Sequence, residues 1–326
     1  MRCEIKSGRA LAIFTAVVII AVGFAVFTIH PVDQLPSFDR RLLEQIQDIR
    51  RLSSSGDWPG LVDALEASHI AIPAGAFLRG SHDYNWDERP EQPVYLNAFS
   101  IDQFEVTNVQ YRKFLSATGG EPPVYWSNNE YPANQADYPV TGVTWEQANQ
   151  YCQWAGERLP TEAEWEKACR GTDGRLYPWG NNWKGKNANL DPLAGSFIAG
   201  LPEDGTSLWD SAWKLLKTNP ENSASRGLRP IGSYPEGASP YGVLDLAGNV
   251  SEWVADWYVF KDYHDLPDQN PFQGGPEWNH GLRGSSWYDP NGSQAWEKEQ
   301  SRCSARNSSH DRIDPRVGFR CALSTP

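Results

Sequence analysis

The sequence predicts a loop-rich α+β domain preceded by one N-terminal transmembrane helix. Short alternating strands and capped helices are mixed along the chain from Ile72 onward, which is typical of an α+β domain. The 28 Gly and 24 Pro among 326 residues break these elements into short pieces, and 15 Trp against one Met indicate a large, rigid core. An apolar run near the N-terminus predicts the membrane helix.

Residues 10–29, ALAIFTAVVIIAVGFAVFTI, carry no charge and as a helix span about 30 Å, the thickness of a bilayer core. Arg2, Lys6 and Arg9 precede them, so the positive-inside rule predicts that residues 1–9 are cytoplasmic and that the rest is exported. A cleaved signal peptide is the alternative, but its apolar run is usually shorter and ends at a small-residue cleavage site. We therefore expect an uncleaved single-pass anchor in the inner membrane, with the main domain periplasmic or extracytoplasmic.

Residues 30–70 are predicted to form a helical stalk or linker. Ser37 can cap a helix, and one apolar stripe follows at Phe38, Leu42, Ile46, Ile49 and Leu52. After the break at SSSGDWPG, a second short helix is predicted from Leu61. The stripe either packs on the main domain or meets a partner or a second copy. We favour packing on the domain, because short amphipathic helices are common core elements.

In the main domain, residues 72–81 and 94–107 alternate as strands do. Three helices are then predicted at residues 107–118, 144–156 and 161–171, with Thr107, Thr144 and Thr161 as their caps. Glu164 completes a capping box in the third helix. Beyond Gly171 the chain is predicted to be mostly loops and short strands.

The charge and the cysteines limit the function classes. A net charge of −12 argues against nonspecific nucleic-acid binding, which needs a basic face. Four cysteines follow the apolar run, and sequence alone leaves three possible pairings among Cys152, Cys169, Cys303 and Cys321. An even count in an exported domain favours disulfides over reactive thiols.

Several motifs resemble, in order, those of the formylglycine-generating enzyme (sulfatase-modifying factor) family. They are FEVTNVQYRKF, RLPTEAEWEKACRG, YGVLDLAGNVSEW, LRGSSWYD and VGFRCA, and the resemblance runs from about Ile72 to Ala322. It implies that residues 71–326 form one domain related to the C-type lectin fold, often with bound calcium. It also implies the disulfides Cys152–Cys321 and Cys169–Cys303.

The oxidase of this family holds copper with two further cysteines, in the interval that matches Ser286 to Arg302. That interval contains no cysteine here, and Asp289 lies near the position expected for the first. Soft Cu(I) selects thiolates, so we expect neither copper nor the family's oxidase mechanism. The six histidines form no local ligand pair, which argues against the iron site of other relatives.

Calcium is the cofactor that the resemblance favours. The family's calcium turn maps onto Asp245, Gly248, Val250 and Glu252. A second, weaker site maps onto Asn189 and Leu190, with Asp204 or Asp210 left open as further ligands. Oxygen ligands suit hard Ca²⁺, although the same residues could serve only the backbone of the turns.

The family's substrate groove maps onto the segment around Ser286, Asp289, Arg302 and Arg306. The arginines could equally be buried partners of carboxylates. If Trp287, Tyr288 and Trp296 line this groove, their rings could bind a peptide or a glycan by stacking on it.

The sequence therefore leads to two hypotheses for the function. The first is a membrane-anchored binding or assembly protein, or an accessory subunit, that holds a protein partner outside the cytoplasm. The alternative is an oxidoreductase of the same superfamily with a non-cysteine mechanism, acting on an exported peptide or a small molecule. Its acid–base groups would be Asp289, Glu297 and Glu299.

Overall fold

The computed structural model describes residues 40–190, 227–288, 294–309 and 313–325, and within them the chain forms an α+β fold as predicted. The predicted anchor, residues 10–29, and the predicted cap Ser37 lie outside the described residues. Within the ranges described, no helix combines the length and apolar character needed to cross a membrane.

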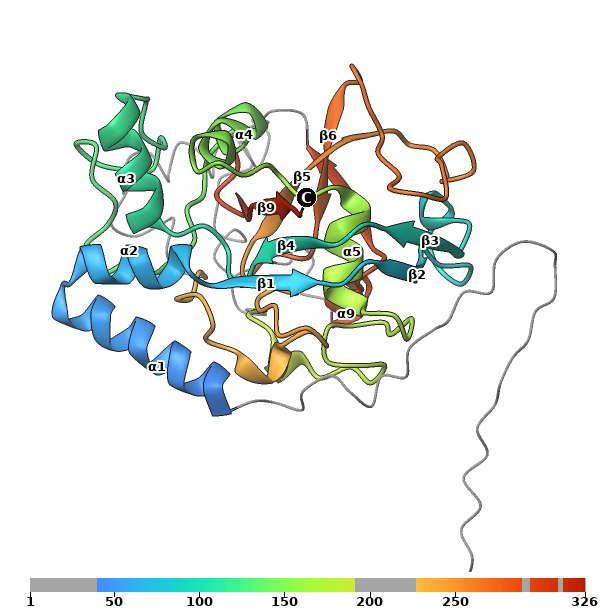
Figure 1. Cartoon of the computed structure of the whole chain (residues 1–326), viewed down its shortest axis with the longest axis horizontal. Coiled ribbons are helices and arrows are strands. Elements are labelled where there is room, and N and C mark those ends of the chain that lie inside the picture. Colours follow the sequence, from blue (N-terminus) through green and yellow to red (C-terminus); the bar gives the residue numbers. More distant parts are fainter. Residues whose placement is uncertain (1–39, 191–226, 289–293, 310–312, 326) are drawn as a thin grey trace, which may run out of the picture. The chain divides into compact units, whose positions relative to one another are not determined.

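Two helices precede the first strand and lie side by side in Figure 1. They are α1 (Arg40–Ser55) and α2 (Trp58–Glu66). Leu42 and Ile49 of α1 are buried in one apolar cluster with residues of α2 and of the main domain, among them Phe104 and Leu244. The apolar stripe therefore packs on the domain, which is the first of the two alternatives.

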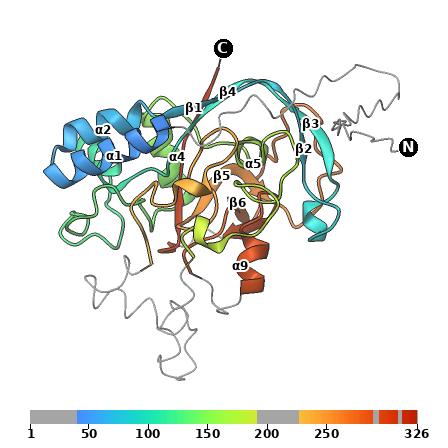
Figure 2. The same ribbon diagram turned by 90° about the horizontal axis from the view of Figure 1, so that it is seen from below.

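The strands of the described residues form three small sheets. The first is antiparallel, in the order β1 (His69–Ile72), β4 (Phe99–Asp102), β9 (Ala322–Ser324). The second is the hairpin of β2 (Gly75–Arg79) and β3 (Gln92–Leu96). The loop that connects these two strands contains the helical turn Trp86–Glu88. Figure 2 shows β1 and β4 running together toward this hairpin.

The third sheet lies beside α5 and has four strands, in the order β7 (Arg306–Ser309), β6 (Asn279–Arg283), β5 (Ser251–Tyr258), β8 (Val317–Phe319). Strands β5 and β8 are parallel, and the other pairs are antiparallel. An irregularity between Trp253 and Trp257 shifts the register of β5 against β6. Such bulges bend a strand locally and redirect its side chains.

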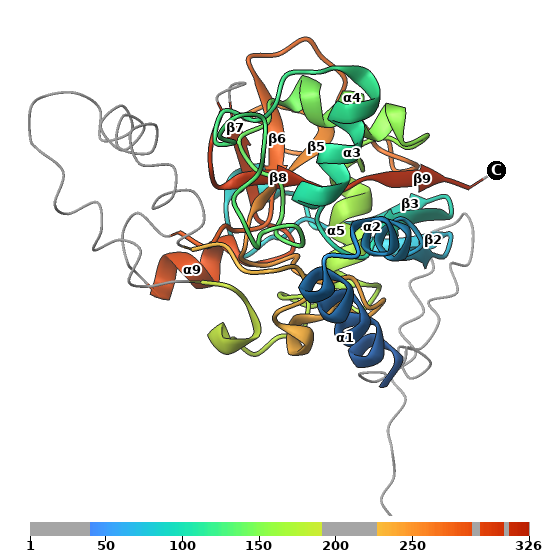
Figure 3. The ribbon, with the colours of Figure 1, turned by 90° about the vertical axis from the view of Figure 1, so that its left-hand side faces the viewer.

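The three predicted helices of the main domain form as α3 (Asn108–Thr118), α4 (Trp145–Trp154) and α5 (Glu162–Arg170). Helices α3 and α4 share one apolar cluster with the third sheet, and Figure 3 shows them next to its strands. Capping boxes begin all three, at Thr107, Thr144 and Thr161. Another described helix, α9 (Gln294–Gln300), lies in a region predicted to be mostly loops and short strands.

Helix α5 is the centre of the core, because all nine of its residues are buried. Its apolar side packs with Phe77, Leu246 and Val254, and Trp165 is fully buried. The charged residues of the same helix are buried as well, and burying a charge is costly unless it is paired. Their partners define the site described next.

Candidate functional site

Two disulfides join helices α4 and α5 to the C-terminal part of the chain. Cys152 of α4 is bonded to Cys321, and Cys169 of α5 is bonded to Cys303, the pairing that the resemblance implies. The chain has five cysteines, so only Cys3 lies outside these bonds. No thiol is left in the main domain to act as a nucleophile or as a copper ligand.

Arg306 is buried and holds two loops together. Its guanidinium donates to both oxygens of Glu162, at 2.8 and 3.1 Å. Nη1 also donates to the backbone carbonyls of Asp87, at 2.8 Å, and Lys261, at 3.0 Å. A planar guanidinium suits such a set of acceptors, so Arg306 joins the turn after β2 to the loop after β5.

Arg302 binds the same turn from a second direction. It is buried, pairs with both carboxylate oxygens of Glu88, and lies 3.6 Å from the ring centre of Tyr84. Burial alone raises the pKa of Glu88, but the hydrogen bonds and charge of Arg302 outweigh it and lower that pKa. Both arginines are thus structural partners of buried carboxylates, which was one of the two readings of this motif.

Further arginines extend this buried network. Glu162 also accepts from Arg79 at 3.0 Å, and Glu166 accepts from Arg170 at 2.9 Å and from Arg283. Burial raises the pKa of Glu162, yet the surrounding guanidinium groups lower it to about 2. Glu162 is therefore a permanent anion at neutral pH and does not serve as a proton carrier there.

Exposed aromatic side chains lie on the two loops that Arg306 joins. Trp86 and Phe260, here called the aromatic pair, meet edge to face with ring centres 4.7 Å apart. They are 44% and 69% exposed, although each adjoins a residue whose carbonyl is bound by buried Arg306. Tyr258 reinforces the join by donating its hydroxyl to the carboxylate of Asp87 at 2.8 Å. The network thus presents a rigid apolar surface to solvent.

The other predicted groove residues do not form an open aromatic slot. Ser286 is buried and donates to the carbonyl of Tyr288, which is buried too. The Trp287 ring packs so closely on Gly227 that a β-carbon there would lie 1.8 Å from the indole. Trp296 is half-buried on α9. Asp289 lies outside the described residues.

The alternative acid–base residues on α9 differ in their surroundings: Glu297 is buried and Glu299 is exposed. They therefore do not share one environment, as a matched acid and base in a single cleft would. Their proposed companion Asp289 is not described.

The predicted calcium turn is a tight loop that contains the left-handed residues Asp245, Gly248 and Asn249. One carboxylate oxygen of Asp245 accepts from the backbone N–H of Gly232 at 2.6 Å. Burial raises the pKa of Asp245 to about 6. Burial makes the ionised form of this carboxylate less favourable, and a bound cation would stabilise that ionised form.

Glu252, the predicted carboxylate ligand, has other partners. Its oxygens accept from Arg320 at 2.6 and 2.7 Å and from the indole N–H of Trp165 at 2.8 Å. A second buried carboxylate faces the turn instead: Glu105 accepts from Asn249 at 2.7 Å and from the N–H of Val250 at 3.3 Å.

Burial raises the pKa of Glu105, and the charges of Asp245 and Glu252 raise it further. Glu105, Asp245 and Glu252 are thus three buried carboxylates whose charges act on one another and on Arg320, so the turn contains several buried negative charges close together.

The second predicted calcium site adjoins the first. The carbonyl of Asn189 accepts from the N–H of Asn249 at 3.0 Å, and the amide of Asn189 donates to the Asn249 side chain at 3.0 Å. Leu190 is the last residue described before the gap, and the candidate ligands Asp204 and Asp210 lie outside the described residues.

Sequence reasoning missed three parts of this region: Glu105, the carboxylate partners of the arginines, and the aromatic pair. Glu105 had a local signal, because it is a charged residue in the otherwise apolar stretch FEV. The pairs had none, since Arg302 and Glu88 are 214 positions apart.

The fold and site define a class of protein: a loop-rich α+β domain fastened by two disulfides and by buried arginine–glutamate pairs. The family model of the sulfatase-modifying factor enzyme 1-like domain matches residues 62–325. The chain belongs to this family, as its motifs indicated.

Relatives within the family carry different names. The formylglycine-generating enzyme of Bos taurus is 28% identical over 319 residues, covering 84% of this chain and 79% of that protein. The inactive C-alpha-formylglycine-generating enzyme 2 of Bos taurus is 29% identical over 313 residues, covering 82% and 92%.

A solved structure, PvdO from Pseudomonas aeruginosa, matches with a TM-score of 0.58 at 21% identity, covering 79% of this chain and 94% of that one. This likeness shows the fold alone. Family membership therefore does not decide between a catalytic and a binding role.

Proposed function

We propose that this chain is a membrane-anchored, extracytoplasmic binding protein, an accessory subunit built on a formylglycine-generating-enzyme-like domain without the copper–cysteine oxidase site. One observation carries the proposal: the four cysteines of the domain are all engaged in disulfides. Copper chemistry of the family's kind needs a pair of free thiolates, and the remaining Cys3 precedes the predicted anchor.

The aromatic pair is the surface on which we expect the partner to bind. Exposed aromatic side chains are common anchors of protein interfaces, and they give most when they are rigid before binding. Arg306 and Arg302 provide that rigidity: Arg306 binds the backbone of both loops, and Arg302 pairs with Glu88 in the turn that carries Trp86. The partner would be a protein of the same membrane or compartment with an apolar segment on its surface.

A structural calcium ion belongs to the same proposal. Asp245 and the backbone carbonyls of Gly248 and Val250 would hold it, with Glu105 as the added carboxylate. Glu252 would support the turn through Arg320 and not by direct coordination. The ion would offset the buried negative charge and stabilise the conformation of the turn, and it would have no catalytic role.

Affinity purification of the full-length protein from detergent-solubilised, cross-linked membranes tests the proposal. It predicts one co-purifying protein in a defined ratio and no stoichiometric copper or iron. Recovery of a partner-free chain would contradict the binding role. Stoichiometric copper with oxidation of a cysteine peptide, or a glycan as the bound species, would replace it with another function.

A further inference from the structure

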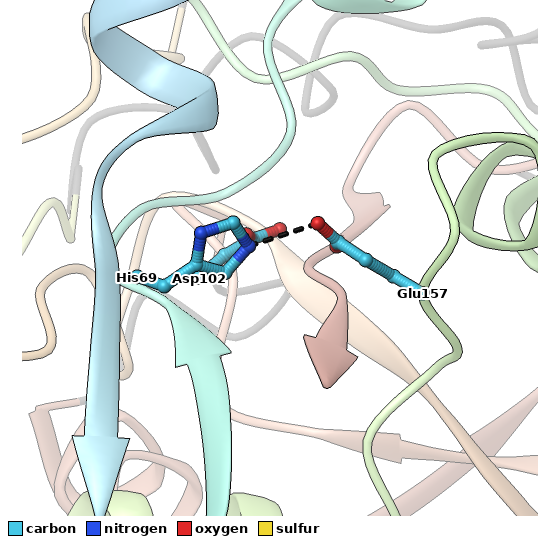
Figure 4. A group of neighbouring side chains, drawn as sticks. All are labelled: His69, Asp102 and Glu157. Carbon is cyan, nitrogen blue, oxygen red and sulfur yellow. Dashed lines mark hydrogen bonds and ion pairs between the residues drawn. The ribbon is translucent and has the colours of Figure 1, made fainter. Parts of the chain in front are cut away.

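A histidine and two carboxylates from three separate segments meet outside the region described above (Figure 4). His69 begins β1, Asp102 ends β4, and Glu157 follows α4. Nε2 of His69 lies 2.8 Å from Oε1 of Glu157 and 3.2 Å from Oδ1 of Asp102. Among the described residues, this is the one group of three or more His, Cys, Asp or Glu side chains whose ligand atoms lie within 4.8 Å of one another.

We propose that His69, Asp102 and Glu157 bind a zinc-type divalent transition metal ion that fastens helices α1 and α2 to the domain. One imidazole nitrogen and two carboxylate oxygens form a mixed donor set that suits zinc better than the hard cations Ca²⁺ and Mg²⁺. With ligands at about 2.0–2.1 Å, a tetrahedral ion needs donor atoms roughly 3.3 Å apart. The two distances given above are close to that separation, so small side-chain shifts would admit the ion.

The backbone holds the three ligands in place. His69 and Asp102 are direct partners in the antiparallel pair β1–β4. Oδ2 of Asp102 accepts from the N–H of Cys321 at 2.8 Å, which leaves Oδ1 to face His69. Such a bond to the second oxygen is the outer-shell support that metal-binding carboxylates usually have.

The backbone at Glu157 is held by hydrogen bonds as well. Its N–H donates to the carbonyl of Cys152 at 2.7 Å, and the neighbouring Arg158 exchanges two backbone hydrogen bonds with Ala322. Because Cys152 and Cys321 are joined by a disulfide, the groups that bind the Asp102 carboxylate and the Glu157 backbone belong to one covalently linked unit. The site is therefore preorganised.

The site is open enough to exchange an ion with solvent. The side chains are partly exposed, 21% for His69, 15% for Asp102 and 11% for Glu157. Three protein ligands with one side open leave a fourth position for water. Since His69 comes three residues after the end of α2, an ion here would tie the α1–α2 segment to β4 and to the turn after α4.

Calorimetric titration of the chelator-stripped, full-length protein with ZnCl₂ at pH 7.5 tests the proposal, with excess Ca²⁺ present to saturate hard-cation sites. We expect one Zn²⁺ per chain. His69→Gln keeps an N–H that can donate to the carboxylates but removes the metal ligand, and should weaken binding about 100-fold or more, because even outer-shell changes cost 10–100-fold. Glu157→Gln should act alike, and the exposed control His264→Gln should leave binding unchanged. Absence of stoichiometric binding, or equal binding by His69→Gln, would overturn the proposal.

A measurement on the unaltered protein covers the case in which the variants do not fold. The X-ray absorption spectrum at the zinc edge should show only nitrogen and oxygen neighbours near 2.0 Å. A sulfur neighbour near 2.3 Å would assign the ion to Cys3 and would overturn the site proposed here.

Discussion

Arg306 binds one carboxylate and two backbone carbonyls from loops that are far apart in the sequence. Lysine carries the same charge but lacks the planar fork. The role of this residue therefore depends on the shape of its head group as well as on its charge.

Arg306→Lys should lower the free energy of unfolding by about 2 kcal/mol, since charged hydrogen bonds in a buried site are lost. Hydrogen exchange should speed up in the turn Trp86–Glu88 and in the loop after β5. Arg175→Lys is the matched control, because Arg175 pairs with a partly exposed carboxylate of its own turn, Asp173. Unchanged exchange in both loops would contradict the joining role of Arg306.

Glu162 predicts a specific acid dependence. Its pKa falls from 4.5 to about 2 in the folded protein, a difference of about 3 kcal/mol. A folded pKa below the unfolded one means that this stability is fully present above about pH 4.5 and is lost as the pH falls toward 2. Glu162→Gln should therefore be much less stable than the unaltered protein at pH 7, and the gap should narrow below pH 4.5 in urea unfolding. A gap that stays constant down to pH 3 would contradict the pairing, and the exposed Glu299→Gln serves as control.

Sequence reasoning reached some of these residues and not others. The cysteine pairing and the turn at Asp245 followed from the resemblance of motifs. The partners of Arg302 and Arg306 did not, because ion pairs that span 144 to 214 positions leave no local pattern. Exposure is also a property of the folded chain, so Trp86 and Phe260 could not be distinguished from the buried Trp165 and Phe319.

At the scale of elements, the sequence predicted the helices whose starts are determined by neighbouring residues. Thr107, Thr144 and Thr161 start helices because their side chains and the following Gln or Glu satisfy the first backbone N–H groups. Helix α9 has seven residues and lies just after an undescribed stretch, 289–293. A helix this short is stabilised mainly by tertiary contacts, which a local pattern does not contain.

Helix α1 predicts a contrast between two positions on the same element. Ile49 is 1% exposed and packs in the cluster with Phe104, whereas Leu43 is 36% exposed. Ile49→Ala should lower the free energy of unfolding by about 2–5 kcal/mol, and Leu43→Ala by far less. Equal, small effects in chemical unfolding would mean that α1 is an independent stalk.

The turn at Asp245 predicts a response to chelation. Removing Ca²⁺ should lower the melting temperature of the full-length protein, and calcium but not magnesium should restore it. Asp245→Asn should reduce that calcium response, while Asp173→Asn, in a separate surface turn, should keep it. A melting temperature that ignores both chelator and calcium would exclude a bound ion from this turn.

At the scale of the whole molecule, the chain has the domain of its family, and all four cysteines of that domain form structural disulfides. Two disulfides, with sequence separations of 169 and 134, connect the helices to the C-terminal segment. Together with the arginine–glutamate pairs they fix a loop-rich chain with little regular structure. This rigidity is what an exposed aromatic anchor needs, and it supports binding as the role of the domain.

The most direct test of this account measures partner capture by surface variants of the full-length protein. Trp86→Ala combined with Phe260→Ala should reduce the cross-linked partner recovered from membranes about tenfold or more, as expected for aromatic anchors of an interface. Trp278→Ala is the matched control, because Trp278 is 83% exposed and lies outside the aromatic pair, and it should leave recovery unchanged. Equal recovery with the double variant and with the control would contradict the central claim that the arginine-supported aromatic pair is the binding surface.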